Sequence, residues 1–135
     1  MNNKLEFPSK EWIEEYCKKL NESAEYNRSA SKWEGDFIFV VEKGSNKKIY
    51  YMDLWHGTCR KALELNDETE IKAEFILRGN YDVWKQLSLG KLDITKALVN
   101  GIIKLKGSLP KLLRNMKGGK VMISVMKDVP TFFNE

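Results

Sequence analysis

The side chains that could carry chemistry in this sequence are few and lie close together. His56, the chain's one histidine, follows Asp53 by three positions, and Cys59 follows His56 by three. A catalytic group usually needs a neighbour that tunes its pKa. Residues three apart on a strand point to opposite faces, so we do not expect an Asp53–His56 pair. We favour a turn position for His56 and a buried, inert Cys59, with a Cys59–His56 couple as the alternative.

Motifs for cofactors and metals are missing from the sequence. Cys17 and Cys59 are too few for a disulfide framework, so we expect reduced thiols. One histidine cannot supply the known zinc motifs, and no phosphate-binding glycine loop or nucleophile elbow occurs. The sequence therefore predicts no metal, no cofactor and no catalytic residue. Residues 1–10 have no apolar signal-peptide core, which predicts a cytoplasmic location.

Length and composition predict one globular domain over residues 1–135. Hydrophobic residues make up 42% and charged residues 31% of the chain, which is sufficient for a buried core. The net charge of +4 is uneven, because residues 1–70 carry −3 and residues 71–135 carry +7. Such a basic C-terminal half can contact an anionic membrane or nucleic acid, or can be an ordinary solvated face. Its unbroken positive stretch consists of Lys96, Lys104, Lys106, Lys111, Arg114, Lys117, Lys120 and Lys127.

The first half of the chain predicts helices followed by strands. Apolar residues recur at helical spacing from Trp12 to Leu20, and Ser9 is a suitable N-cap. Residues 37–43 and 48–55 are rich in β-branched and aromatic side chains around a glycine-containing loop, which predicts a hairpin. The other elements expected here are a weaker helix over 23–32, a strand over 59–65 and an alternating strand over 71–78.

The second half predicts short helices that end at glycines. One carries Val83, Trp84 and Leu87 and ends at Gly90, and another is capped by Asp93. Residues 102–106 predict a fifth strand, Ser108 caps a helix that includes Met116, and residues 120–129 fit either a strand or a helix. This order of elements predicts an α+β domain with an antiparallel or mixed sheet of about five strands.

Five blocks in the second half occur in a recognisable order with short gaps. They are Ala73-Glu74-Phe75-Ile76-Leu77, Tyr81-Asp82-Val83-Trp84-Lys85, Gly90-Lys91-Leu92-Asp93, Ala97-Leu98-Val99-Asn100-Gly101 and Ile103-Lys104-Leu105-Lys106-Gly107. This arrangement resembles the sterol carrier protein 2 family. Residues 33–36, 53–57 and 129–133 are similar to its stand-alone prokaryotic members, so the resemblance covers nearly the whole chain.

The resemblance implies a five-stranded, mostly antiparallel sheet that helices cover on one side, with a hydrophobic tunnel between them. It also implies that residues 120–129 form a helix. Carried over position by position, the tunnel wall would consist of Phe39, Val41, Phe75, Leu77, Trp84, Leu98, Ile102, Leu112, Met116, Met122 and Met126.

The function implied by the resemblance is non-enzymatic binding and transfer of a fatty acyl chain, acyl-CoA, isoprenoid or sterol-like lipid. The basic C-terminal stretch would contact an anionic membrane, no nucleic acid is expected, and the protein would be a monomer or a homodimer. The alternative is an enzyme or accessory subunit of lipid or quinone metabolism, with His56 and Cys59 at the mouth of the pocket. The chain ends in Phe133-Asn134-Glu135 rather than Ser-Lys-Leu, so peroxisomal import is not expected.

Overall fold

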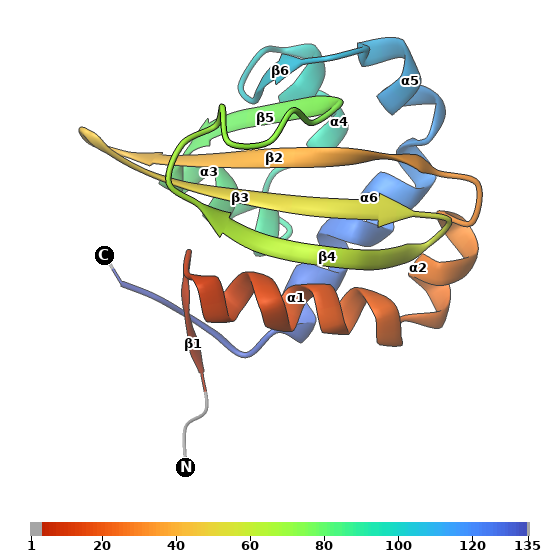
Figure 1. Cartoon of the computed structure of the whole chain (residues 1–135), viewed down its shortest axis with the longest axis horizontal. Helices are drawn as coiled ribbons and strands as arrows, with labels where there is room; N and C mark the ends of the chain where they lie inside the picture. Colours follow the sequence, from red (N-terminus) through yellow and green to blue (C-terminus); the bar gives the residue numbers. More distant parts are fainter. Residues whose placement is uncertain (1–3, 135) are drawn as a thin grey trace.

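A five-stranded sheet with the strand order β4-β3-β2-β5-β6 organises the computed structural model, which describes residues 4–134 (Figure 1). Neighbouring strands are antiparallel except for the parallel pair β2 and β5. The predicted α+β class and mostly antiparallel sheet are therefore confirmed. The expectations about a signal peptide and a C-terminal address depend partly on residues 1–3 and 135, which lie outside the described residues. The strands are β2 (Glu34–Lys43), β3 (Asn46–Trp55), β4 (Thr58–Leu65), β5 (Phe75–Asn80) and β6 (Lys104–Lys106).

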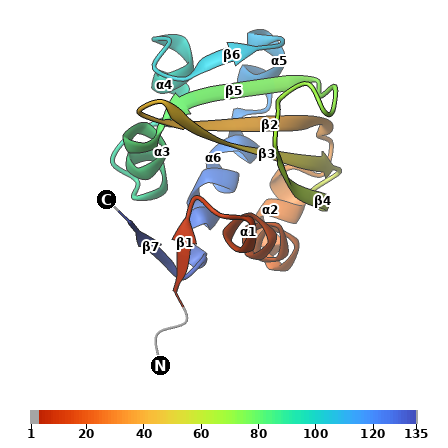
Figure 2. The ribbon, with the colours of Figure 1, turned by 60° about the vertical axis from the view of Figure 1, so that its left-hand side comes forward.

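Six α-helices accompany the sheet in the described chain. Figure 1 shows α1 running along β4, while α6 crosses behind the strands, and Figure 2 shows the same arrangement from the side. The ambiguous residues 120–129 are largely helical, as the family resemblance implied. The helices are α1 (Lys10–Glu22), α2 (Ala24–Ser29), α3 (Tyr81–Ser88), α4 (Ile94–Val99), α5 (Leu109–Arg114) and α6 (Met116–Val125), and a 3-10 turn, η1 (Met126–Asp128), follows.

The two faces of the sheet are covered differently. The inner face contacts the helices and contributes to the main core, whereas the outer face forms a smaller cluster around Ile38, Val40 and Ile49. Residues 66–74 cover this outer cluster, because Ile71 and Ala73 pack against it. Only the inner face has helices over it, so it is the side on which an interior site can form.

The predicted strand over 71–78 begins only at Phe75. In the preceding loop, the Glu70 carboxylate accepts hydrogen bonds from the backbone N–H groups of Asn66 and Asp67. The Asp36 carboxylate accepts another from the N–H of Glu74, at 2.7 Å. Side-chain acceptors therefore take backbone donors that a longer strand would give to its neighbour.

The helix predicted from Ser108 through Met116 is two helices. Asn115 ends α5, and its Nδ2 donates a hydrogen bond to the carbonyl oxygen of Lys111 at 2.8 Å. The fifth strand begins at Lys104 rather than at residue 102. A small parallel sheet of β1 (Leu5–Phe7) and β7 (Thr131–Phe133) was not predicted, because strands of three residues show no periodic pattern.

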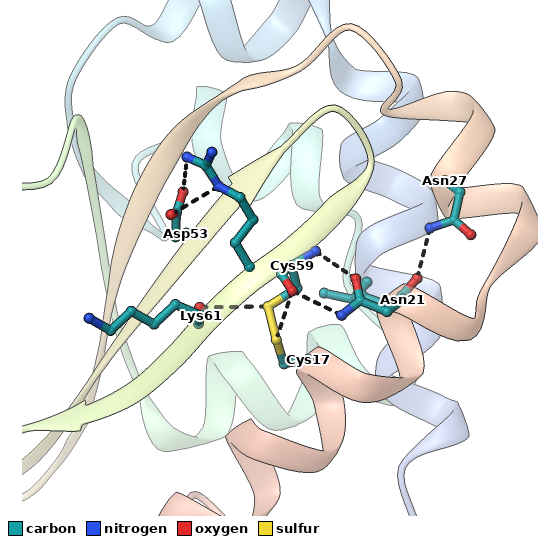
Figure 3. Close-up of a disulfide and its surroundings, with 8 residues drawn as sticks. Cys17, Asn21, Asn27, Asp53, Cys59 and Lys61 are labelled. Carbon is teal, nitrogen blue, oxygen red and sulfur yellow. Dashed lines mark hydrogen bonds and ion pairs between the residues drawn. A yellow bond between two sulfur atoms is a disulfide. The ribbon is translucent and has the colours of Figure 1, made fainter.

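The expectation of reduced thiols is wrong. Cys17 on α1 and Cys59 on β4 form a disulfide, with Cα atoms 5.5 Å apart (Figure 3). Asn21, one turn after Cys17, receives a hydrogen bond from the N–H of Cys59 and donates one to its carbonyl oxygen. The two cysteines are 42 positions apart, and only the packing of α1 along β4 brings them together.

The disulfide also affects the prediction of a cytoplasmic location for the protein. Disulfides persist mainly in oxidising compartments. The cysteine content therefore no longer accords with the prediction of a cytoplasmic protein, which now depends on residues 1–10 alone. Among residues 4–134, no helix has the length and apolarity that crossing a bilayer requires.

Candidate functional site

The main interior cavity lies between the inner face of the sheet and the helices. It has a volume of about 80 Å³, and apolar side chains form most of its wall. Strands β2, β3 and β5 form one side, and the helices α2, α3, α4, α5 and α6 form the rest. Its lining consists of Tyr26, Ser29, Ala30, Trp33, Phe37, Phe39, Leu54, Leu77, Trp84, Ile94, Leu98, Leu112, Asn115, Met116, Gly118, Gly119, Met122 and Ile123.

Aromatic rings give the sheet side of this cavity a fixed shape. Trp33 stacks on Phe37 with ring centroids 5.6 Å apart, and Phe37 stacks on Phe39 at 5.4 Å. The ring of Trp84 meets Phe39 edge-on at 5.7 Å, and the Trp84 indole N–H donates a hydrogen bond to the carbonyl oxygen of Val40. Because the indole has a buried partner, Trp84 can line an apolar space without leaving a donor unpaired.

The opposite wall is helix α6, which packs against α1 and α2 among other elements. The hydroxyl of Tyr16 on α1 donates a 2.6 Å hydrogen bond to the carbonyl oxygen of Met122. Gly118 lies against Ala30, the C-cap of α2, where an added Cβ would be 3.3 Å from the Ala30 methyl group. A small residue is therefore needed at 118 for α6 to approach α2 this closely.

A second apolar cavity, of about 40 Å³, continues from the first toward α1 and η1. The two share Phe39, Trp84, Met122 and Ile123 as wall residues, so they adjoin. The other residues of the second cavity are Phe7, Pro8, Trp12, Ile13, Tyr16, Val41, Tyr50, Met52 and Met126.

The phenols in these walls are neutral at physiological pH. Burial raises the pKa of Tyr26 to about 12. Burial, and to a lesser degree the nearby Tyr26, raises the pKa of Tyr16 well above its ordinary value. Neither cavity therefore places a charge next to a hydrocarbon ligand.

The structure brings most of the residues expected in the wall together. Phe39, Leu77, Trp84, Leu98, Leu112, Met116 and Met122 line the first cavity, and Val41 and Met126 line the second. Phe75 is fully buried in the core but lines neither cavity.

Ile102 does not fit the expected wall. Its side chain is 42% exposed, whereas that of its neighbour Ile103 is only 1% exposed. Residues 102 and 103 lie between α4 and β6, outside any helix or strand, and no periodic pattern indicates there which of two adjacent isoleucines points inward.

Several lining residues were missed by the sequence reasoning. Tyr26 and Ala30 come from α2 and its C-cap, a stretch with only a weak helical pattern, and Ile94 is the first residue of α4. Trp33 and Phe37 did carry a signal. Their apolar character continues the alternation of Phe39 and Val41 along one strand face.

The residues that could have carried catalysis lie away from both cavities. His56 is half exposed at the β3–β4 turn, where its Nε2 is 2.6 Å from the Glu34 carboxylate. Asp53 instead holds Arg60 through two hydrogen bonds of 3.1 Å. Cys59 is in the disulfide and has no thiol, so the Cys59–His56 couple, which was the alternative prediction, does not form.

His56 occupies the turn position that the sequence predicted. His56 and Gly57 both have positive φ values, of 50° and 77°, in a two-residue hairpin turn. Gly57 is required here for a second reason, because an added Cβ would lie 2.3 Å from the carbonyl oxygen of Asn27. The turn thus anchors β3 and β4 against α2.

An interior of this kind can take up hydrocarbon but not polar material. Polar groups buried without partners lose free energy, whereas apolar groups gain about 0.8 kcal/mol per CH₂. Engineered apolar cavities of about 150 Å³ bind benzene. The first cavity has about half of that volume, so a longer hydrocarbon chain fits only if part of the wall moves.

The fold and the apolar cavities together define a small α+β domain with an apolar interior site. Residues 13–118 match the SCP-2 sterol transfer family. The chain belongs to this lipid-binding family, which confirms the resemblance found in the sequence.

Solved structures agree with this assignment. A crystal structure of sterol carrier protein 2 is 31% identical, with a TM-score of 0.82, over 90% of this chain and 97% of that one. The solution structure of a conserved hypothetical protein from Thermus thermophilus is 30% identical, also with a TM-score of 0.82, over 92% and 90%. The sterol carrier protein 2 of Aedes aegypti, solved in complex with palmitate, shares the fold at 20% identity and a TM-score of 0.57, over 87% and 94%. No curated protein matches the chain.

Proposed function

We propose that this protein binds a hydrophobic lipid between its sheet and α6 and transfers it without catalysing a reaction. The observation that carries the proposal is the pair of adjoining apolar cavities on the inner face. Family membership supports lipid as the ligand, and a fatty acyl chain, acyl-CoA, isoprenoid or sterol-like molecule are the classes we consider. Residues 1–135 would act as one lipid-binding domain, either as a monomer or as a homodimer.

The energetics suit a carrier that must also release its ligand. Burying a 16-carbon chain gains roughly 13 kcal/mol at about 0.8 kcal/mol per CH₂. Association costs of about 4 to 15 kcal/mol, together with the displacement of α6, leave a net affinity in the weak to submicromolar range. Methionine side chains at 116 and 122 suit a wall that adapts to different ligands, because they are unbranched and flexible.

Two adjacent leucines on α5 allow a direct test. Leu112 lines the first cavity, whereas the side chain of Leu113 is 36% exposed. We expect Leu112→Trp to reduce the binding of a fluorescent fatty acid analogue at least tenfold, because the indole fills the space the chain needs. Leu113→Trp is the matched control and should bind like the parent protein.

Thermal unfolding must accompany this test, because overpacking a core costs about 1 to 3 kcal/mol. Leu112→Phe is the milder variant to use if Leu112→Trp does not fold. Unchanged binding by a folded Leu112→Trp protein would contradict an interior site. Lipid extraction and mass spectrometry of the freshly purified protein would then report which species it carries.

We further propose that the basic C-terminal stretch contacts an anionic membrane. Two of its members already have partners, since Lys111 is 2.7 Å from Glu74 and Lys120 is 3.8 Å from Asp93. Exposed Val99 and Ile102 lie between Lys96 and Lys104 in the sequence, in the segment that joins α4 to β6. Each basic residue near an anionic surface contributes about 1 kcal/mol.

Vesicle binding tests this contact. We expect binding to vesicles that contain anionic lipid at low salt and weaker binding to neutral vesicles. Lys96→Gln/Lys104→Gln should reduce this preference for anionic over neutral vesicles. Lys32→Gln/Lys72→Gln, which replaces two exposed lysines elsewhere, should leave the preference unchanged. Equal binding to neutral and anionic vesicles would exclude the electrostatic contact.

A further inference from the structure

A third cavity lies at the tip of the β2–β3 hairpin, and unlike the other two it has charged side chains in its wall. It has a volume of about 180 Å³ and shares Phe7, Pro8 and Val41 with the second cavity. The three cavities therefore lie end to end, from the apolar interior beside α6 to the protein surface. The other residues of this outer cavity are Glu6, Lys43, Asn46, Lys47, Lys48, Tyr81 and Asn134.

Two of its lysines belong to the inner face of the sheet. Lys43 follows Val41 on the same face of β2, and Lys48 pairs with Val41 in the β2–β3 register. The Lys43 ammonium donates a 2.8 Å hydrogen bond to the carbonyl oxygen of Asn134 and lies 4.4 Å from the centre of the Tyr81 ring. Both ammonium groups therefore stand where the apolar path reaches solvent.

The charged residues that line this outer cavity, which forms the mouth of the apolar path, carry a net positive charge. Lys47 lies 3.3 Å from the Glu68 carboxylate, with which it forms an ion pair. Glu6 is the acidic residue in this wall, and its carboxylate accepts a hydrogen bond of 3.5 Å from the Asn134 side chain. One carboxylate thus faces Lys43 and Lys48, and a ligand anion can still gain net attraction here.

A buried hydroxyl lies just inside this mouth. Tyr50 is 3% exposed and lines the second cavity, and its hydroxyl makes no hydrogen bond with a described residue. Burial raises its pKa, the Glu64 carboxylate on β4 raises it further, and Glu11 and Glu6 make smaller contributions in the same direction. The group is therefore protonated and can donate. An unpaired buried hydroxyl costs about 1 to 3 kcal/mol, and a ligand oxygen would remove that cost.

We propose that Lys43 and Lys48 bind the anionic headgroup of a single-chain lipid, and that the Tyr50 hydroxyl donates a hydrogen bond to it. The hydrocarbon then lies in the two apolar cavities with its end beneath α6. This inference depends on the proposed lipid binding and adds to it the class of headgroup and the direction of the chain.

The distribution of polarity supports this direction. A carboxylate or phosphate would be strongly destabilised beside Phe39 and Trp84, because neither apolar cavity has a charged side chain in its wall. At the mouth the anion stays partly hydrated and gains charge-assisted hydrogen bonds from ammonium groups. The narrow interior, with cavities of about 80 and 40 Å³, favours one chain over two.

Headgroup binding and membrane contact would then use different surfaces. The lysines of the outer cavity belong to the β2–β3 hairpin, while Val99 and Ile102 lie at and just after the end of α4. Figure 1 shows the tip of this hairpin well apart from α4. Substitutions at Lys43 and Lys48 should therefore change ligand preference without changing the binding of the protein to anionic vesicles.

The test compares palmitic acid, hexadecyl phosphate and hexadecanol, which have equal chain lengths, by displacement of a neutral fluorescent probe. We expect the parent protein to prefer the two anions over the alcohol. Lys48→Gln should weaken binding of the anions about threefold to tenfold and leave hexadecanol unchanged, and Lys43→Gln/Lys48→Gln should weaken it further. Lys32→Gln/Lys72→Gln controls for net charge. The stronger of the two anions identifies the headgroup as a carboxylate or a phosphate.

Tyr50→Phe separates ligand binding from folding. Removing an unpaired buried hydroxyl should not lower the melting temperature, yet anion binding should weaken a fewfold. The headgroup site would be overturned if Lys48→Gln weakened binding of the anions and of the alcohol equally, or if it weakened binding of neither. Failure of the parent protein to bind any of the three ligands would instead overturn the proposed lipid binding itself.

Discussion

Helices α1 and α6 both cover the inner face of the sheet, but they are attached to the protein in different ways. Helix α1 has 13 residues, a Ser9 cap that accepts a hydrogen bond from the N–H of Trp12, and a disulfide to β4. Helix α6 has 10 residues, no capping side chain, and Gly118 and Gly119 in its first half.

This difference indicates which wall of the interior can move. An interior glycine weakens a helix by about 1 kcal/mol relative to alanine, whereas a disulfide typically stabilises a protein by about 2 to 4 kcal/mol. The cavities are too small for a whole acyl chain, so the wall must yield somewhere. We infer that α1 is the fixed side and that α6 is displaced when ligand enters.

Of the substitutions that test this difference between α1 and α6, removal of the disulfide should have the largest effect on stability. We expect Cys17→Ser/Cys59→Ser to lose about 3 to 4 kcal/mol of unfolding free energy, because the bond closes a loop of 42 positions. Urea denaturation measures the loss, and a reducing agent should destabilise the parent protein equally but leave the double variant unchanged. Reductant-insensitive stability of the parent would mean that the bond does not hold α1.

Tyr16→Phe cuts the hydrogen bond that joins the two helices. It should lower the unfolding free energy by about 1 to 2 kcal/mol, because the Met122 carbonyl oxygen loses its buried donor. Release of a bound fatty acid analogue, followed by stopped-flow fluorescence, should become faster as α6 detaches more easily. Slower or unchanged release would show that this bond does not restrain α6.

Gly119→Ala should change the unfolding free energy least, and it should raise it rather than lower it. Its added Cβ meets only the flexible Met116 side chain, 3.2 Å from the sulfur, so the helix gains about 0.5 to 1 kcal/mol. A stiffer α6 should take up ligand more slowly. Gly118→Ala is the contrasting variant, because its Cβ would press on Ala30 and should be destabilising. Faster uptake by Gly119→Ala would argue against α6 as the moving wall.

Much of the fold could be predicted because the sequence of its helices and strands has regular apolar patterns. The apolar spacing from Trp12 to Leu20 and the Ser9 cap predicted α1, and the glycine-flanked β-rich runs predicted the β2–β3 hairpin. Hydrogen bonds from side chains to the nearby backbone made the start of β5 harder to predict. The turn residues Asp67 and Glu70 capture backbone donors, so β5 begins later than the alternation from Ile71 suggested.

By itself the sequence determined the α+β class, the family and the apolar character of the interior, because these follow from periodicity and ordered motifs. Only the tertiary structure decided the Cys17–Cys59 bond, the outward position of Ile102 and the meeting of Lys43 with Glu6 and Asn134 at one opening. Each of these depends on which surfaces pack together across long separations, and local residue patterns carry no information about such contacts.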